Sequence, residues 1–249
     1  MSSALQPLDK SFIGFANPWV IGPYAFAKTR LYNVYIPDSV TEIGFSAFKE
    51  CDYLTSVNIP NSLIEIGDGA FNCVYASNKI VFKPLLLPSS LRIIGESAFS
   101  ACHIEGNLRL PADLEKLGAH AFENCGFSGD LVIPSKITEI PDYCFSGNYI
   151  ERLTLPNGLL RIGDQALCGT GDLILPNSLR EIGENAFGGS PYEYEFTNHG
   201  SVYKYLQKFS GKLVIPESVM LIGTGAFANQ DFSGTFEIPK NISIVPTGI

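Results

Sequence analysis

Three histidines, six cysteines and a recurring set of glutamates are the residues of this 249-residue chain that could do chemistry. His103 and His120 stand at different points of a repeated pattern, and His199 lies in an inserted segment, so no two of them share an evident metal or catalytic site. The sequence also lacks a Cys-x-x-Cys pair, a G-x-S-x-G element, a phosphate-binding loop and a dinucleotide-binding glycine pattern. It therefore predicts no enzymatic activity, no metal and no cofactor.

The glutamates and cysteines follow the repeat as well. Glu42, Glu65, Glu139 and Glu181 each precede an Ile-Gly or Ile-Pro pair, which indicates a solvated column of carboxylates rather than an acid/base pair. Cysteines follow the repeated phenylalanine by two or three residues in four successive copies: Cys51, Cys73, Cys102 and Cys125. A residue tied to the repeat in this way is typical of a buried, reduced thiol, with a disulfide or a zinc ligand as the alternative.

Charge and hydropathy exclude two classes of partner. The formal net charge is −8 with a sequence pI of about 4.9, and the basic residues are scattered, so the chain has no basic footprint for nucleic acid. Its apolar runs are far shorter than the roughly 20 residues that span a bilayer, so no membrane-spanning segment is expected. The N-terminal sequence MSSALQPLDKSF has neither the basic start nor the apolar core of a secretory signal.

A proline after an apolar residue marks the repeat, with a basic period of 23 residues. It occurs at Pro37, Pro60, Pro88, Pro111, Pro134, Pro156, Pro176, Pro216 and Pro239. Six residues after each proline stands Ile, Leu or Val, usually followed by Gly-x-x-Ala-Phe. A segment of this size cannot bury its apolar residues alone, so the period predicts a solenoid of stacked coils.

Each copy divides into three parts. The alternating x-apolar-x-apolar segment before the proline predicts a strand that ends where proline removes the N–H donor. Glycine then permits a sharp change of direction. The Ala-Phe pair predicts a short helical turn whose ring fills the interior of the coil, with Leu167 replacing the ring in one copy.

The pattern L-x-x-I-x-I-P-x-S-L-x-x-I-G-x-x-A-F-x-x-C resembles the BspA-like leucine-rich repeats, over roughly residues 12–249. The resemblance implies an α/β-type, mainly β, right-handed solenoid of about ten coils. It would have a parallel sheet on its concave face and short strand or 3₁₀ pieces on its convex face. The resemblance also implies a bacterial surface or secreted protein, and hence an extracellular or cell-surface location.

We expect a single solenoid domain over residues 1–249. Residues 1–26 form a degenerate first copy in which Trp19 covers the end of the stack as a cap. The last copy, NISIVPTGI, is incomplete because it stops where a tenth Ala-Phe is due.

The largest departure from the period is a Tyr-rich insertion at residues 188–212. Apolar and polar residues alternate on both sides of a turn-like TNHG, which predicts a hairpin with an aromatic face. Its candidate interaction residues are Tyr192, Tyr194, Phe196, Tyr203 and Tyr205. The alternative is that this face packs on neighbouring coils, or that the segment is a variant repeat. A smaller insertion at residues 74–83 occurs at the same place in its copy and could project from the same edge.

The outward strand positions of the expected concave sheet lie two residues before each proline. They are Tyr35, Asn58, Leu86, Arg109, Val132, Thr154, Ile174, Val214 and Glu237. Four of these nine are aliphatic, which is more than a solvated sheet face needs. Either β-branched residues simply favour strands here, or the row forms a shallow apolar groove for another protein.

These observations favour a non-catalytic interaction module for a macromolecular partner, most readily a host or microbial surface or matrix protein in an adhesion role. Two other functions stay open. One is glycan binding within a surface polysaccharide-uptake system, with the Tyr-rich insertion as a stacking platform, and the other is a structural spacer for a further domain.

Overall fold

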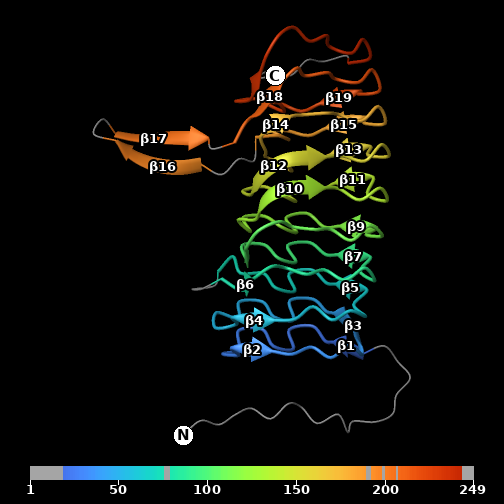
Figure 1. Cartoon of the computed structure of the whole chain (residues 1–249). Coiled ribbons are helices and arrows are strands. Elements are labelled where there is room, and N and C mark those ends of the chain that lie inside the picture. The colour runs from blue at the N-terminus through green and yellow to red at the C-terminus, as the bar shows by residue number, and fades with distance from the viewer. Residues whose placement is uncertain (1–18, 76–78, 189–191, 198–199, 206, 243–249) are drawn as a thin grey trace, which may run out of the picture.

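A computed structural model describes residues 19–75, 79–188, 192–197, 200–205 and 207–242. For residues 192–197 and 200–205 it describes the backbone alone. Within these residues the chain is a β-solenoid whose coils stack into a column, and no helix occurs in them (Figure 1). The described residues accordingly contain no helix long and apolar enough to cross a membrane.

Nine short strands lie just after the repeat prolines or their equivalents and stack in parallel register. They are β1 (Trp19–Ile21), β3 (Val40–Ile43), β5 (Glu65–Ile66), β7 (Ile93–Ile94), β9 (Lys116–Leu117), β11 (Glu139–Ile140), β13 (Arg161–Ile162), β15 (Glu181–Ile182) and β19 (Leu221–Ile222). They form a five-stranded and a four-stranded sheet. The break falls where Pro141 replaces the glycine, since the glycine N–H otherwise bonds the preceding coil, as Gly118 does to Ile94 at 2.8 Å.

A second set of strands lies before the prolines. It comprises β2 (Asn33–Val34), β4 (Ser56–Val57), β6 (Val81–Phe82), β8 (His103–Ile104), β10 (Ser128–Val132), β12 (Tyr149–Thr154), β14 (Gly171–Asp172), β18 (Phe209–Gly211) and β20 (Asp231–Phe232). These strands pair in parallel as four small sheets: β2-β4, β6-β8, β10-β12 and β14-β18-β20. The parallel sheet predicted on this side therefore occurs as four smaller parallel sheets. One of the three breaks, between β4 and β6, coincides with the smaller insertion, whereas β14 and β18 pair across the larger one.

The Ala-Phe segment is a series of turns rather than the predicted short helical or 3₁₀ piece. Its backbone N–H groups bond alternately within the turn and to the next coil. The phenylalanine N–H groups bond the next coil, as Phe48 does to the Ala70 carbonyl at 2.7 Å and Phe99 to the Ala121 carbonyl at 2.9 Å. The residue before the alanine adopts a left-handed conformation, for example Ser97 with φ of 54°. Bonds between coils replace the bonds within a turn that a helix would make. The α part of the predicted fold class is not confirmed.

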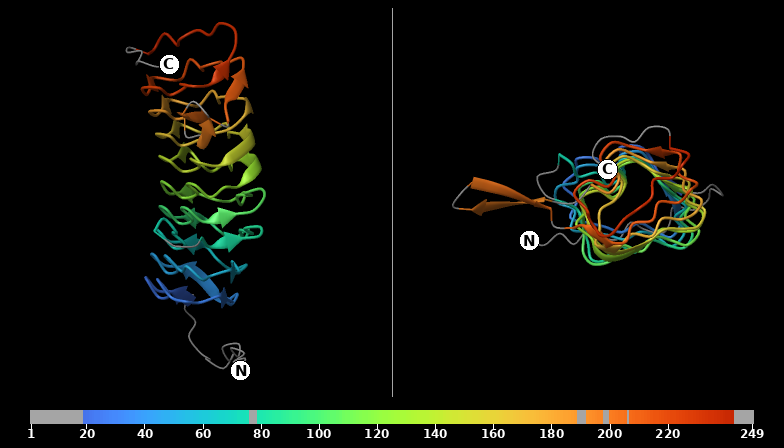
Figure 2. Two further views of the ribbon diagram at one scale, coloured as in Figure 1. Left: turned by 90° about the vertical axis from the view of Figure 1, so that its left-hand side faces the viewer. Right: turned by 90° about the horizontal axis from the view of Figure 1, so that it is seen from above.

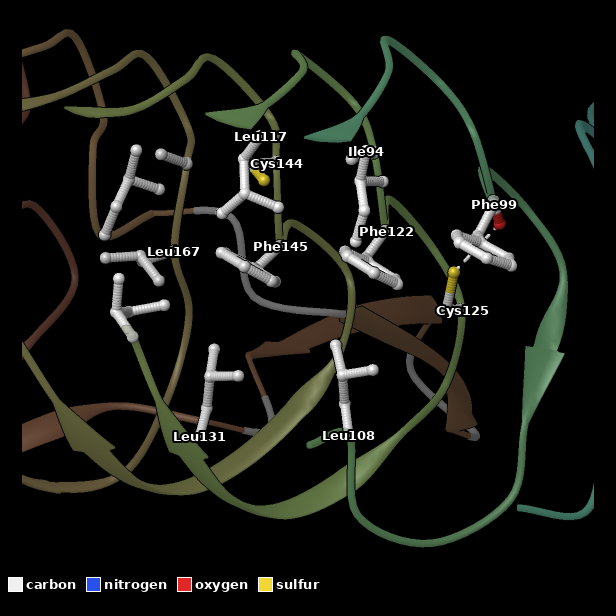
Figure 3. Packing of buried hydrophobic residues seen from close by; sticks show 14 of the residues in the cluster. Ile94, Phe99, Leu108, Leu117, Phe122, Cys125, Leu131, Cys144, Phe145 and Leu167 are labelled. Carbon is white, nitrogen blue, oxygen red and sulfur yellow. Dashed lines mark hydrogen bonds between the residues drawn. The ribbon is translucent and has the colours of Figure 1, made fainter. Parts of the chain in front are cut away.

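The interior is a stack of phenylalanine rings. Phe48, Phe71, Phe99 and Phe122 follow one another at centroid distances of 5.2–5.3 Å with nearly parallel planes. Figure 3 shows Leu167 continuing the line beyond Phe145, so the copy without a ring keeps the position apolar. This spacing is close to the separation of neighbouring strands, roughly 4.8 Å, so the rings of successive coils stay in contact.

Polar side chains join the coils beside this core. The serine two residues after the proline donates to a backbone carbonyl of the preceding coil, as Ser62 does to Val40 at 2.7 Å and Ser218 to Leu179 at 2.7 Å. All six cysteines are buried with free thiols, as predicted for those tied to the repeat. Cys125 donates to the Phe99 carbonyl at 3.0 Å, the bond drawn in Figure 3. Thiols and hydroxyls thus satisfy carbonyls that neighbouring coils leave free.

At the N-terminal end, β1 pairs with β3, and the Phe26 ring stacks on Phe48 at 5.2 Å. Trp19 is about half exposed in the structure. Residues 1–18 and 243–249 lie outside the described residues, so the cap formed by residues 1–26, the incomplete last copy and the tenth coil stay predictions.

Candidate functional site

The outward positions before the prolines form one face of the column, which we call the pre-proline face. Its large apolar members are strongly exposed: Tyr35 by 76%, Leu86 by 72% and Ile174 by 78%, with Val132 and Val214 above half. Arg109, Thr154 and Glu237 are exposed too. Asn58 differs, because its amide bonds both the N–H and the carbonyl of Ile36 and holds the side chain half-buried.

The repeat places these side chains in a row. Val132 in β10 is the register partner of Thr154 in β12, so equivalent positions of adjacent coils lie side by side there. Successive coils repeat at roughly one strand spacing, about 4.8 Å. The aliphatic members Val132, Ile174 and Val214 therefore share the C-terminal half of this face with Thr154, while Leu86 lies farther along the column. The structure thus exposes the residues that the sequence singled out, without a deep groove around them.

The opposite outward positions, in the strands after the prolines, form the post-proline face. Here charges are paired across coils. Arg161 bonds Glu139 at 2.6 Å, Asp142 at 3.0 Å and Glu181 at 3.2 Å. Partial burial alone would lower the pKa of Arg161, but its hydrogen bonds to the three carboxylates outweigh that effect and raise the pKa above its ordinary value. This face contains the predicted carboxylate column, and part of that column serves as an ion-pair network.

The Tyr-rich insertion contains the predicted hairpin. Strands β16 (Tyr192–Thr197) and β17 (Gly200–Tyr205) pair antiparallel, with Tyr192 opposite Tyr205 and Tyr194 opposite Tyr203. Since strand residues alternate between two faces, Tyr192, Tyr194 and Phe196 occupy the same face of the ribbon as Tyr203 and Tyr205. Figures 1 and 2 show this hairpin standing away from the column, on the side where β6 lies in Figure 1.

The candidate metal or catalytic residues do not converge. His103 is exposed in β8, while His120 stacks on Tyr143 at 4.7 Å and bonds Glu123 at 2.9 Å. His199 lies outside the described residues. Within the described ranges, no group of three His, Cys, Asp or Glu residues could hold a metal ion.

Sequence reasoning missed one concave site. A shallow hollow of about 490 Å³ lies where four successive coils enter their pre-proline strands β2, β4, β6 and β8. Its lining comprises Tyr32, Asp52, Tyr53, Leu54, Thr55, Lys79, Val81 and His103. The two tyrosines stand at different points of the repeat and the lysine comes from the smaller insertion, so no periodic pattern marked them.

Comparison with known proteins agrees with this architecture. The family described as "BspA type Leucine rich repeat region" matches residues 20–85 and 77–193, in six copies. No curated protein sequence matches significantly. A leucine-rich repeat protein from Bacteroides ovatus is similar at 24% identity with a TM-score of 0.53, over 90% of this chain and 66% of that one, so this chain spans slightly less than two thirds of that protein. A leucine rich cell surface protein from Faecalibacterium prausnitzii aligns at 17% identity with a TM-score of 0.31, over 84% and 74%.

Proposed function

Because this chain belongs to the BspA-type leucine-rich repeat family, we propose that it is a non-catalytic module that binds a protein partner through its pre-proline face. The family's repeats generally form interaction domains rather than enzymes. We extend the proposal to a cell-surface or secreted setting and an adhesion role, which the resemblance to bacterial surface proteins supports. The partner would be a host or microbial surface or matrix protein.

The observation that supports the proposal is the exposed apolar row. Val132, Ile174 and Val214 each keep more than half of their surface in solvent on a scaffold whose interior is fully packed. Exposed aliphatic side chains gathered on one face are typical of a surface that another protein covers. A rigid column also loses little conformational entropy on binding, so burial of these side chains contributes directly to affinity.

A second candidate is glycan binding by the hairpin. This candidate is supported by the antiparallel pairing of Tyr192 with Tyr205 and of Tyr194 with Tyr203 in a ribbon that stands away from the coils. Tyrosine provides a large contact surface at low cost in conformational entropy, which suits a stacking platform for sugar rings. This candidate uses residues 192–205 rather than the pre-proline face, so the two are separable by mutation.

The experiment is a binding screen of the purified chain against a panel of extracellular-matrix proteins and a glycan array. The face variant combines Val132→Thr, Ile174→Thr and Val214→Thr. Its matched control combines Ile64→Thr, Leu160→Thr and Met220→Thr, which are exposed apolar residues four positions after their prolines. The hairpin variant changes Tyr192, Tyr194, Tyr203 and Tyr205 to serine.

We expect a matrix-protein ligand whose affinity falls by about tenfold or more in the face variant, as for loss of several contact residues at an interface centre, and stays unchanged in the control. Equal loss in both variants, or loss in the hairpin variant alone, would contradict a role for the pre-proline face. A glycan lost only with the hairpin would establish the second candidate. No ligand in either panel would favour the spacer function.

A further inference from the structure

The hollow at the entry of β2, β4, β6 and β8 is separate from the pre-proline face and from the hairpin. We propose that it binds an acidic sugar residue, such as a uronic acid, at the end or within an oligosaccharide. The inference goes beyond the protein-binding function, because none of its residues belongs to the pre-proline row or to the hairpin.

Two tyrosine rings provide the apolar wall. Tyr32 is 60% exposed and Tyr53 39%, and their ring centroids lie 5.7 Å apart with planes inclined by 58°. Two inclined rings form an open angle rather than a flat platform. The C–H groups of a pyranose ring bear partial positive charge and pack against the negative face of an aromatic ring. Buried Leu54 and half-buried Val81 add apolar surface to the lining of the hollow.

Polar side chains from neighbouring coils surround this apolar wall. Asp52, Thr55, Lys79 and His103 all line the hollow, and the last three are exposed. Together they offer a carboxylate, a hydroxyl, an ammonium group and an imidazole, which are the groups that hydrogen-bond sugar hydroxyls. A few polar groups placed around an apolar wall are typical of a small-ligand site, and the volume of about 490 Å³ lies within the usual range.

The charges favour an acidic sugar over a neutral one. Among the described residues, no carboxylate lies within ion-pair distance of Lys79 or Arg30, whereas Lys83 in the same insertion pairs with Glu105 at 2.9 Å. The Arg30 guanidinium lies 5.9 Å from the Tyr53 ring centroid and adds positive charge beside the hollow. On a protein of net charge −8, two cations without a carboxylate partner mark a place where a ligand carboxylate is attracted. The Asp52 carboxylate can then accept hydrogen bonds from sugar hydroxyls.

The test uses the full chain and three acidic oligosaccharides, built from galacturonate, glucuronate or sialic acid, each beside a neutral counterpart. Saturation-transfer NMR detects binding and calorimetric titration measures it. The variants are Tyr32→Ser with Tyr53→Ser, Tyr53→Phe, and Lys79→Gln. Matched controls are Tyr24→Ser, an exposed tyrosine outside the hollow, and Lys116→Gln, an exposed lysine on the post-proline face. Unfolding midpoints verify that each variant is folded.

We expect at least one acidic oligosaccharide to bind about tenfold more tightly than its neutral counterpart, with the double tyrosine variant about tenfold weaker and Tyr53→Phe close to wild type. Lys79→Gln should remove most of the preference for acid, and the controls should change nothing. Failure of all three acidic probes to bind, equal binding of the neutral sugars, or full binding by the folded double variant would overturn the proposal. The face variant should leave sugar binding intact, so each proposal can fail without the other.

Discussion

The pre-proline and post-proline faces come from the same repeat and cover the same interior, yet their outward side chains are satisfied in different ways. On the post-proline face, Arg161 pairs with Glu139 and Glu181 of the two neighbouring coils. On the pre-proline face, Val132 and Ile174 are apolar and stand in solvent. The difference teaches that coil geometry requires only the inward positions. Outward positions are free to vary. Around Arg161 they pair within the molecule, whereas the positions two residues before the prolines leave Val132 and Ile174 in solvent, even though Asp130 of β10 and Arg152 of β12 pair at 2.7 Å.

The largest expected effect comes from what both faces share. Phe99 is fully buried between Phe71 and Phe122, so Phe99→Ala should lower the free energy of unfolding by about 3–5 kcal/mol through lost contacts and a cavity. Phe99→Leu is the matched control, because Leu167 already occupies this place in another coil. Urea unfolding measures the free energy of unfolding of both variants. A loss below roughly 1 kcal/mol for Phe99→Ala, well under the range for such truncations, would contradict the ring stack as the shared core.

The buried thiols next to that stack make the shared core sensitive to alkali. Burial raises the pKa of the Cys168 thiol to about 12. The folded state therefore keeps a proton that the unfolded chain releases above its ordinary thiol pKa of about 8.5, so this stabilisation is intact below pH 8.5 and falls as pH rises. Between pH 7 and pH 10 the expected loss from Cys168 is about 2 kcal/mol.

Urea unfolding of wild type and Cys168→Ala at both pH values measures this effect. The alanine variant should lose about 2 kcal/mol less than wild type over the interval. Identical pH dependence in the two proteins would contradict a protonated, buried Cys168.

A smaller effect separates the two faces. Arg161→Met removes a partly exposed cation from three carboxylates, and we expect a loss of about 1 kcal/mol that shrinks in 1 M NaCl. Arg109→Met on the pre-proline face is the control, since Arg109 makes no ion pair with any described residue and should change stability little. Equal effects of the two substitutions would remove the contrast in charge pairing.

The smallest effect is expected at the residues proposed to bind. Ile174→Thr changes a side chain that is 78% exposed, so unfolding stability should stay within about 0.5 kcal/mol of wild type. Thermal and urea unfolding measure it. A loss of 2 kcal/mol or more would show that Ile174 packs in the folded protein and is not free for a partner.

Much of this architecture was predictable because the repeat encodes it. Proline spacing, the Ile-Gly position and the Ala-Phe pair predicted a stack of coils, and alternation around residues 198–199 predicted the hairpin. The turn geometry was not predictable in this way. Ala-Phe suits a helical turn locally, but the Phe48 and Phe99 N–H groups bond the next coil, and such a preference arises only when coils stack.

The site was predictable only in part. The exposure of Ile174 follows from strand alternation, since Leu173 and Leu175 on either side are buried. The hollow does not follow from any local pattern. Tyr32, Tyr53, Lys79 and His103 come from four coils, and only the superposition of those coils brings them together.

The measurement that tests the central claim most directly is hydrogen–deuterium exchange of the chain with and without the matrix protein identified in the screen. We predict that bound partner slows exchange in β10, β12 and the segments at 172–176 and 212–216. Strands β11, β13 and β15 should exchange as in the free protein. Protection confined to β11, β13 and β15 would contradict the account, because it would place the partner on the face whose charges are already paired within the column.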